Sequence, residues 1–198
     1  MTTVYFVRHA QSDYSVHDDL TRPLTERGHK DCALVTEFLR DKKIGAVFSS
    51  PYKRAADTVC GFAKSAGLPV QTVDDFRERK VADGWLEDFW AFAQKQWADF
   101  SYKLPNGECL AEVQARNIGA LKKILAQRDG ESIAIGTHGT ALSAIINYYD
   151  SAYGYADFMT VAGIMPWVVI MRFDKNGCAE MEKVNLFQIG QTPEASQK

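Results

Sequence analysis

The sequence predicts an α/β domain of three layers, α/β/α, with a mixed, mostly parallel central sheet and a helical insertion after the third strand. Short apolar runs alternate with amphipathic stretches of helical period, which is typical of layered α/β folds. An Asn176-Gly177 pair between two apolar runs indicates a hairpin, so at least one strand pair is antiparallel. Over residues 74–107 the alternation stops, and a charged segment is followed by an aromatic one.

Each expected element rests on its own signal. Apolar runs of strand length predict strands over residues 2–8, 46–49, 70–73, 132–137, 167–173 and 179–184. Helical period predicts helices over residues 26–41, 51–66, 86–100, 108–128 and 141–149. Thr25 is a suitable N-cap for the first helix, and Pro51 suits the first turn of the second, which Gly67 and Pro69 end. The last dozen residues are polar, and we expect them to fray.

The composition is that of an ordinary globular domain. The chain has 198 residues, 46% of them hydrophobic and 24% charged, which suits a single domain over 1–198 in which 74–107 forms a lid or specificity insertion. A net charge of −2 argues against a nucleic-acid or membrane partner. The longest apolar run, 161–171, is interrupted by Pro166 and is shorter than the ~20 residues of a membrane helix.

The cysteines are scattered along the chain and form neither a zinc pattern nor a disulfide framework. They are Cys32, Cys60, Cys109 and Cys178. We therefore expect free thiols in a reducing compartment and no metal site. No basic segment precedes the first apolar run, so we expect no signal peptide and a cytoplasmic location.

Two histidines stand where apolar runs end. His9 follows the run that closes with Arg8, and His138 follows a second such run. In open α/β sheets, ligands bind in the crevice beyond the carboxyl ends of the strands. Two imidazoles and a guanidinium at that edge make a phosphate-handling site the leading hypothesis. His17 and His29 have no such setting, and we expect them in loops or on the surface.

Five segments in this order resemble the histidine phosphatase superfamily, also called phosphoglycerate mutase-like. They are Arg8-His9-Ala10-Gln11-Ser12, Arg22-Pro23-Leu24-Thr25-Glu26-Arg27-Gly28, Ser49-Ser50-Pro51-Tyr52-Lys53-Arg54-Ala55-Ala56-Asp57-Thr58, Asn106-Gly107-Glu108-Cys109 with the later Arg116, and Thr137-His138-Gly139. The resemblance runs from about residue 4 to residue 140. The chain departs from the family pattern at Ala10, where glycine is more usual, at Gln11, where glutamate is frequent, and at Cys109, where serine is usual. In the acid region, Phe76-Arg77-Glu78-Arg79-Lys80 matches only at its opening.

This resemblance implies a metal-independent phosphatase of the histidine acid type, which needs no cofactor and hydrolyses a small phosphomonoester through a phosphohistidine on His9. Arg8, Arg54 and a cationic His138 would hold the phosphoryl oxygens. The two arginines would also disfavour protonation of His9, whose pKa as a free side chain is ~6.5.

The general acid and base that the resemblance implies is Glu78. The other carboxylates that stay open for this role are Asp83, Glu87 and Asp88. Further candidates for contact with the phosphate are Gln11, Ser15 and Gly139. Glu108 and Arg116 are expected to form a structural pair outside the site.

Two other functions stay open. A mutase would move the phosphoryl group within its substrate, but the double-arginine, proline-rich segment that mutases carry after their acid is absent from this sequence. A non-catalytic phosphate-binding module on the same fold would usually have lost one of the two histidines or two arginines, which are all present here.

Overall fold

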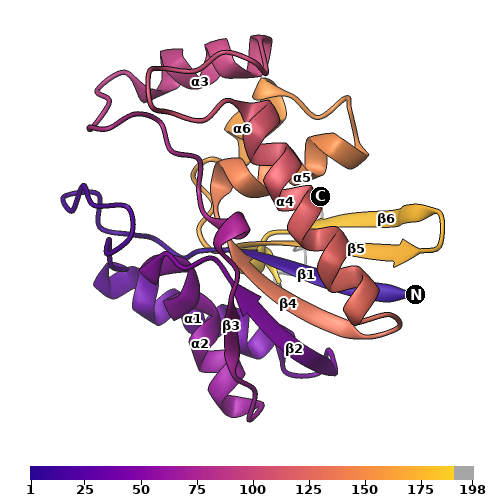
Figure 1. Cartoon of the computed structure of the whole chain (residues 1–198). Coiled ribbons are helices and arrows are strands. Elements are labelled where there is room, and N and C mark those ends of the chain that lie inside the picture. The colour runs from indigo at the N-terminus through magenta and orange to yellow at the C-terminus, as the bar shows by residue number, and fades with distance from the viewer. Residues whose placement is uncertain (190–198) are drawn as a thin grey trace, which may run out of the picture.

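A six-stranded sheet runs through the computed structural model, which describes residues 1–189 (Figure 1). Its strands are β1 (Thr2–Arg8), β2 (Ile44–Ser49), β3 (Val70–Thr72), β4 (Ser132–Thr137), β5 (Trp167–Asp174) and β6 (Gly177–Val184). They lie in the order β3-β2-β4-β1-β5-β6. The first four are mutually parallel, whereas β5 is antiparallel to β1 and β6 is antiparallel to β5. The prediction of a mixed, mostly parallel sheet is confirmed.

Helices cover both faces of the sheet. They are α1 (Glu26–Leu39), α2 (Lys53–Ser65), α3 (Phe89–Ala98), α4 (Leu110–Gln127), α5 (Gly139–Tyr149) and α6 (Tyr155–Val161), with 3₁₀ turns η1 (Asp74–Phe76) and η2 (Leu186–Gln188). Figure 1 shows α1 and α2 on one side of the sheet and α3 to α6 on the other. The expected three layers are therefore present, and the expected helical insertion after β3 contains η1 and α3.

The central strand β1 is buried on both faces, because its side chains feed two separate cores. Val4 and Phe6 pack with α4 and α5, and Tyr5 and Val7 pack with α1 and α2. Continuous apolar runs such as this one suit a parallel sheet that is covered by helices on both sides. The core thereby fixes the position of the residues that follow β1.

Several element boundaries differ from the sequence-based expectations, and one helix was not expected. Thr25 caps α1 as expected, since its hydroxyl accepts a hydrogen bond from Gly28 N at 3.0 Å. Pro51 lies outside α2, which begins only at Lys53. β2 begins two residues earlier than expected, and α3 is shorter than the aromatic stripe because Asp88 caps it. The short helix α6 was not expected at all, since apolar content conceals helical period in a segment of seven residues.

A crevice between β1 and β4 opens at their carboxyl ends. These strands pair in parallel with Arg8 opposite Thr137. After β1 the chain leads to α1 on one face, and after β4 it leads to α5 on the opposite face. In open α/β sheets, the usual ligand crevice lies where the helices that follow two adjacent strands cover opposite faces of the sheet.

The division of the chain into one domain with a lid stays a prediction. Within residues 1–189, no helix combines the length and the apolar character needed to span a bilayer. The expectation of a frayed end falls mostly on residues 190–198, which lie outside the described part of the chain.

Candidate active site

The floor of the site is made by two histidines that leave neighbouring strands side by side. His9 N donates to Thr137 O at 3.0 Å, which extends the pairing of β1 and β4 by one step. His138 follows Thr137 and is the N-cap of α5. The two rings therefore meet edge to face, with 5.3 Å between their centroids. His9 is only 5% exposed and His138 is fully buried.

The ring of His9 is held in one tautomer. Its Nδ1 lies 2.7 Å from Ala10 O, so Nδ1 donates and Nε2 keeps its lone pair. Ala10 is itself fixed from α2, because its N–H donates to Thr58 Oγ1 at 3.0 Å. Burial, followed by the positive charges of Arg54 and Arg8, holds the pKa of His9 well below its ordinary value of 6.5. The ring is therefore neutral at neutral pH.

Arg54, in the first turn of α2, reaches the free nitrogen of His9. Its Nε donates to His9 Nε2 at 3.3 Å. Nη1 donates to Asp19 O at 2.7 Å, and Nη2 donates to the Asp19 carboxylate at 3.2 Å. The same carboxylate pairs with Arg22 at 3.0 Å. In the free protein, a carboxylate thus engages the guanidinium that was expected to bind phosphate.

Arg8 has a different arrangement from the one expected. Its Nη1 and Nη2 donate to main-chain carbonyls at the end of α6 and beyond it, those of Val161, Ala162 and Ile164, at 2.6 to 3.2 Å. Its buried Nε has no partner within residues 1–189. A Cβ at Gly139 would lie 3.2 Å from the guanidinium, so glycine lets Arg8 cross the start of α5. Arg8 brings positive charge and the Nε donor to the site. Its Nη1 and Nη2 instead hold the end of α6 in place.

His138 is oriented by Ser50, which follows β2. The two side chains are joined by a hydrogen bond of 2.7 Å between His138 Nε2 and Ser50 Oγ, and Nδ1 has no partner in the described chain. Burial, followed by the charge of Arg54 and by His9, holds the pKa of His138 well below 6.5. In the free protein the ring is thus neutral, which differs from the cationic form that we expected.

Glu78 lies against the first turn of α5. Its Oε2 accepts from Thr140 N at 3.0 Å, and its Oε1 accepts from Ala141 N at 3.0 Å and Arg79 N at 2.8 Å. The N-terminus of a helix favours a carboxylate at this position. Oε2 has only one partner and is the oxygen with more capacity for a further proton or hydrogen bond.

The alternative carboxylates lie elsewhere. None of the three lines the pocket that contains His9 and Glu78. Asp83 pairs with Lys80 at 2.6 Å, Asp88 accepts from Ala91 N at the start of α3, and Glu87 is exposed. Their positions favour Glu78 among the four candidates.

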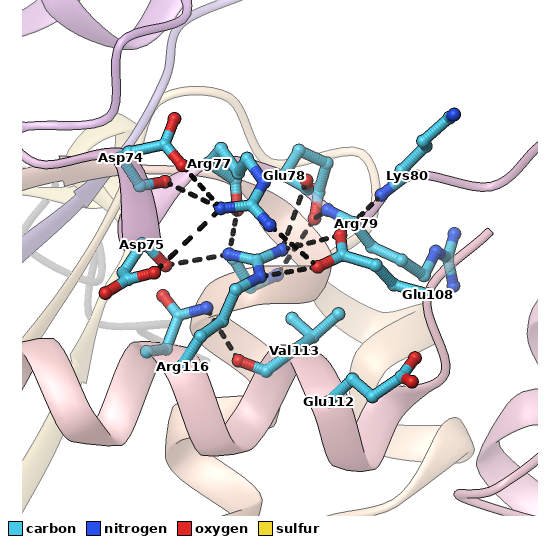
Figure 2. Close-up of polar contacts among 12 residues, drawn as sticks. Asp74, Asp75, Arg77, Glu78, Arg79, Lys80, Glu108, Glu112, Val113 and Arg116 are labelled. Atoms are coloured by element: carbon cyan, nitrogen blue, oxygen red, sulfur yellow. Dashed lines mark hydrogen bonds and ion pairs between the residues drawn. The ribbon is translucent and has the colours of Figure 1, made fainter. Parts of the chain in front are cut away.

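The segment that carries Glu78 is held by an ionic clasp, which we define as Glu108 and Arg116 with Arg77 (Figure 2). Arg116 donates to Glu108 at 2.7 and 3.0 Å, and Arg77 donates to the same carboxylate at 3.1 Å. Arg116 also donates to main-chain oxygens of Asp75, Arg77 and Glu78. The expected pair of Glu108 and Arg116 is formed, and neither residue lines the pocket.

A pocket of about 470 Å³ lies above this floor. Its polar lining includes Arg8, His9, Asp19, Arg22, Arg54, Glu78, Arg79 and Gly139. Its outer wall is apolar and aromatic, with Trp85, Leu86, Phe89, Trp90, Phe158 and Met165. Trp85 stacks on His17 with 4.2 Å between the ring centroids, so the insertion contacts the loop that follows β1.

Three of the residues expected to contact phosphate are not among those that line this pocket, namely Gln11, Ser15 and His138, and His138 is fully buried with its ring against that of His9. Gln11 accepts from Thr25 Oγ1 at 2.9 Å and lines a separate, smaller hollow. Ser15 is exposed, and its hydroxyl donates to Asp13 at 2.7 Å within its own turn. Gln11 thus contacts the N-cap residue of α1, and Ser15 stabilises its own turn.

The sequence analysis missed Asp19, Arg22 and Arg79 as lining residues. Asp19 and Arg22 are three residues apart in a polar loop, a spacing that is equally common in solvated turns. Arg79 belongs to a charged run that is otherwise partly exposed, whereas Arg79 itself is 2% exposed. His17 lies in a loop, as expected, and it also lines the pocket. Within residues 1–189 there is no group of three or more His, Cys, Asp or Glu that could hold a metal ion.

Comparisons with known proteins agree on one family. The model of the histidine phosphatase superfamily (branch 1) matches residues 4–184. The chain is 29% identical over 153 residues to the uncharacterized phosphatase PhoE of Bacillus subtilis, covering 74% of this chain and 76% of that one. It is 30% identical over 160 residues to the metal-independent phosphoserine phosphatase of Arabidopsis thaliana, covering 73% and 67%. Other relatives of similar identity are named probable phosphoglycerate mutases.

The fold also matches solved structures. Mycobacterial glucosyl-3-phosphoglycerate phosphatase, solved with VO3, superposes with a TM-score of 0.77 over 92% of this chain and 98% of that one, at 19% identity. At this identity the likeness concerns the fold alone.

Proposed function

The chain belongs to the histidine phosphatase superfamily, and we propose that it hydrolyses small phosphomonoesters through a phosphohistidine on His9. One observation carries the proposal. His9 is neutral, its Nδ1 is held by Ala10 O, and its Nε2 faces Arg54 at the floor of the pocket. An imidazole in this state is a nucleophile at Nε2, placed beside a cation that attracts phosphate.

In the first step, His9 Nε2 attacks phosphorus and the bond between phosphorus and the ester oxygen breaks. Glu78 takes up a proton from solvent when the negatively charged substrate binds, and the ester oxygen takes this proton from Glu78 and leaves as an alcohol. We assign the transfer to Oε2 of Glu78, which has the single partner Thr140 N. Arg54 and Arg8 line the pocket and bring donors and positive charge to the phosphoryl group, and we assign a supporting role to His138, whose buried ring packs against that of His9.

In the second step, water gives a proton to Glu78 and attacks the phosphoryl group. The bond from phosphorus to Nε2 breaks, inorganic phosphate leaves, and His9 and Glu78 return to their starting states. A bound phosphate dianion would favour a protonated His138, although the free site holds this ring neutral. Because these steps use only side chains and water, the proposed activity is metal-independent.

The test is hydrolysis of p-nitrophenyl phosphate and of a panel of natural phosphomonoesters by the wild type and the His9→Ala variant. We expect the substitution to abolish release of inorganic phosphate. The wild type, treated briefly with substrate and quenched at alkaline pH, should carry acid-labile phosphate on His9. The matched control is His29→Ala, which removes an exposed imidazole outside the pocket. Full activity in His9→Ala after treatment with a chelator would contradict the proposal.

The same assays separate the two other readings of the family. A mutase would interconvert 2- and 3-phosphoglycerate, with bisphosphoglycerate as activator, and would release little phosphate. A phosphate-binding module would bind inorganic phosphate but would neither turn over any phosphoester nor accumulate phosphohistidine. We also propose that the enzyme stays active in mildly acidic solution, because the lowered pKa of His9 keeps the nucleophile neutral below pH 6.5. The cytoplasmic location stays a prediction.

A further inference from the structure

Two arginines that line the pocket, Arg22 and Arg79, take no part in the proposed chemistry, and of these Arg22 pairs with Asp19. Arg79 follows Glu78 directly and lines the same pocket as His9 and Arg54. Only 2% of its surface is exposed. Figure 2 shows its side chain leaving the clasp, in the direction away from Arg116.

The guanidinium of Arg79 lacks a carboxylate partner within residues 1–189. Arg54 pairs with Asp19 and Arg116 pairs with Glu108, but no ion pair of Arg79 is formed in this part of the chain. It lies instead against the rings of Phe89 and Phe92, at 5.3 and 5.1 Å from their centroids. Burial of a guanidinium that has no ion pair is unfavourable, so we expect Arg79 to have a role beyond packing.

Gln96 on α3 fixes the orientation of this guanidinium. Its Nε2 donates to Tyr102 O and to Glu108 O, both at 2.9 Å, so its Oε1 must face Arg79 and accepts from Nη1. Gln96 is fully buried, which prevents an alternative pairing with water. One neutral amide therefore holds one end of the guanidinium, and the carboxylates of Glu78, Glu108 and Asp19 act on its charge only from beyond ion-pair distance.

The other edge of the guanidinium is free. Nε is buried without a hydrogen-bond partner in residues 1–189, and the bond to Gln96 uses Nη1, not Nη2. Nε and Nη2 lie on the same edge and form the two-pronged donor that matches the two oxygens of a carboxylate.

We propose that Arg79 binds a carboxylate on the leaving group, so that the substrates are small phosphomonoesters of carboxylic acids. This inference rests on the proposed phosphatase function. The phosphoryl group occupies the floor, where Arg8 and Arg54 supply the charge, and the acid group of the same molecule reaches the wall at Arg79. A carboxylate fits better than a second phosphate, because a single guanidinium supplies one positive charge and one donor pair.

The experiment compares two pairs of substrates that differ in the acid group. They are 3-phosphoglycerate with glycerol 3-phosphate, and phosphoserine with phosphoethanolamine. In the wild type we expect kcat/KM to be about 10- to 100-fold higher for the acid of each pair, as a charge-assisted bidentate contact provides. Arg79→Met should reduce this ratio to near 1 and leave kcat/KM for the partner without the carboxylate within about threefold. Equal kcat/KM values within both pairs in the wild type would overturn the proposal.

Two controls address charge and folding. Lys80→Met removes a neighbouring exposed cation that pairs with Asp83, and it should keep the preference for acids. Arg79→Lys keeps the charge but loses the donor pair, and we expect an intermediate ratio. If Arg79 had only a structural role, the substitutions would lower activity on both partners equally and leave the ratio unchanged, which would refute the assignment.

Binding separates this inference from the proposed function. In the His9→Ala variant, calorimetry should show tighter binding of phosphoserine than of phosphoethanolamine, and Arg79→Met should abolish the difference. Preferential binding without hydrolysis of any ester by the wild type would support the carboxylate subsite and refute the phosphatase. Hydrolysis without preference would refute the subsite and leave the phosphatase intact.

Discussion

The floor of the pocket is held by main-chain hydrogen bonds, whereas its wall is held by side chains. At the floor, His9 and His138 are adjacent because β1 and β4 pair in parallel with Arg8 opposite Thr137. At the wall, Glu78 and Arg79 lie on an irregular segment that the clasp and Gln96 keep in place.

This difference separates two properties of the site, the nucleophile at the floor and the choice of substrate at the wall. The floor is part of the sheet and of two buried cores, so the proposed nucleophile depends on the most cooperative part of the fold. The wall depends on a few polar contacts between segments distant in the sequence. We infer that substitutions of wall residues other than Glu78 change the choice of substrate while the nucleophile at the floor stays in place.

We expect the largest effect on activity from the replacement of Arg54 at the floor. Arg54→Met should lower kcat/KM for p-nitrophenyl phosphate by about 10²- to 10³-fold, the usual cost of a lost donor to developing charge. The pKa of His9 should also rise, because the positive charge of Arg54 is its second cause of depression after burial. Ring-proton NMR titration measures this pKa directly.

Lys53→Met is the matched control for Arg54→Met. Lys53 is exposed and pairs with Asp57 on the outer side of the same helix, so its loss should leave both kcat/KM and the His9 titration unchanged. A kcat/KM in Arg54→Met within about threefold of the wild type would show that the floor does not depend on this cation.

The sequence predicts the floor well because strands leave a strong pattern. The apolar runs that end at His9 and His138 locate both strands, and a parallel sheet puts their carboxyl ends at one edge. The segment with Arg54 could be placed there through the family resemblance. The structure brings these groups together, while their chemical roles stay predictions.

The wall could not be predicted to the same degree. Arg79 and Gln96 are 17 residues apart, and no periodicity links them. From the sequence alone, the charged run around Glu78 is as consistent with a solvent-exposed surface as with a pocket wall. Arg79 is buried only because α3 packs over it. Likewise, the engagement of Arg8 by the end of α6 depends on a helix that the sequence pattern did not show.

A smaller effect is expected from breaking the clasp at the wall. Glu108→Gln keeps the shape of the side chain but removes the charge that Arg116 and Arg77 share. We expect a loss of ~1–3 kcal/mol in the free energy of unfolding at pH 7, measured by urea titration. Glu180→Gln, in an exposed pair with Arg172, should cost less than ~0.5 kcal/mol.

The pH dependence sharpens this test. Burial raises the pKa of Glu108, but hydrogen bonds from Arg116 and from the main chain of Lys80 outweigh it, so the pKa lies below its ordinary value of 4.5. The stabilisation is thus fully present above pH 4.5 and is lost as the pH falls through the lowered value. The wild type and Glu108→Gln should therefore converge in stability in acid, and a constant difference would contradict the assignment.

The smallest effect is expected at Asp19, which belongs to the loop over the floor and engages both Arg54 and Arg22. An incoming phosphate must compete with this carboxylate for Arg54. Asp19→Asn keeps an oxygen that can accept from Arg54 Nη2, and the main-chain bond from Nη1 is unaffected. The substitution thus removes charge with little change in geometry, and inorganic phosphate should inhibit about two- to fivefold more strongly, as expected for a partly exposed ion pair. Asp41→Asn removes the same charge from an exposed position outside the pocket and should leave the inhibition constant unchanged. If phosphate instead bound more weakly to Asp19→Asn, the carboxylate would be a support for Arg54, and the floor would depend on side chains as the wall does.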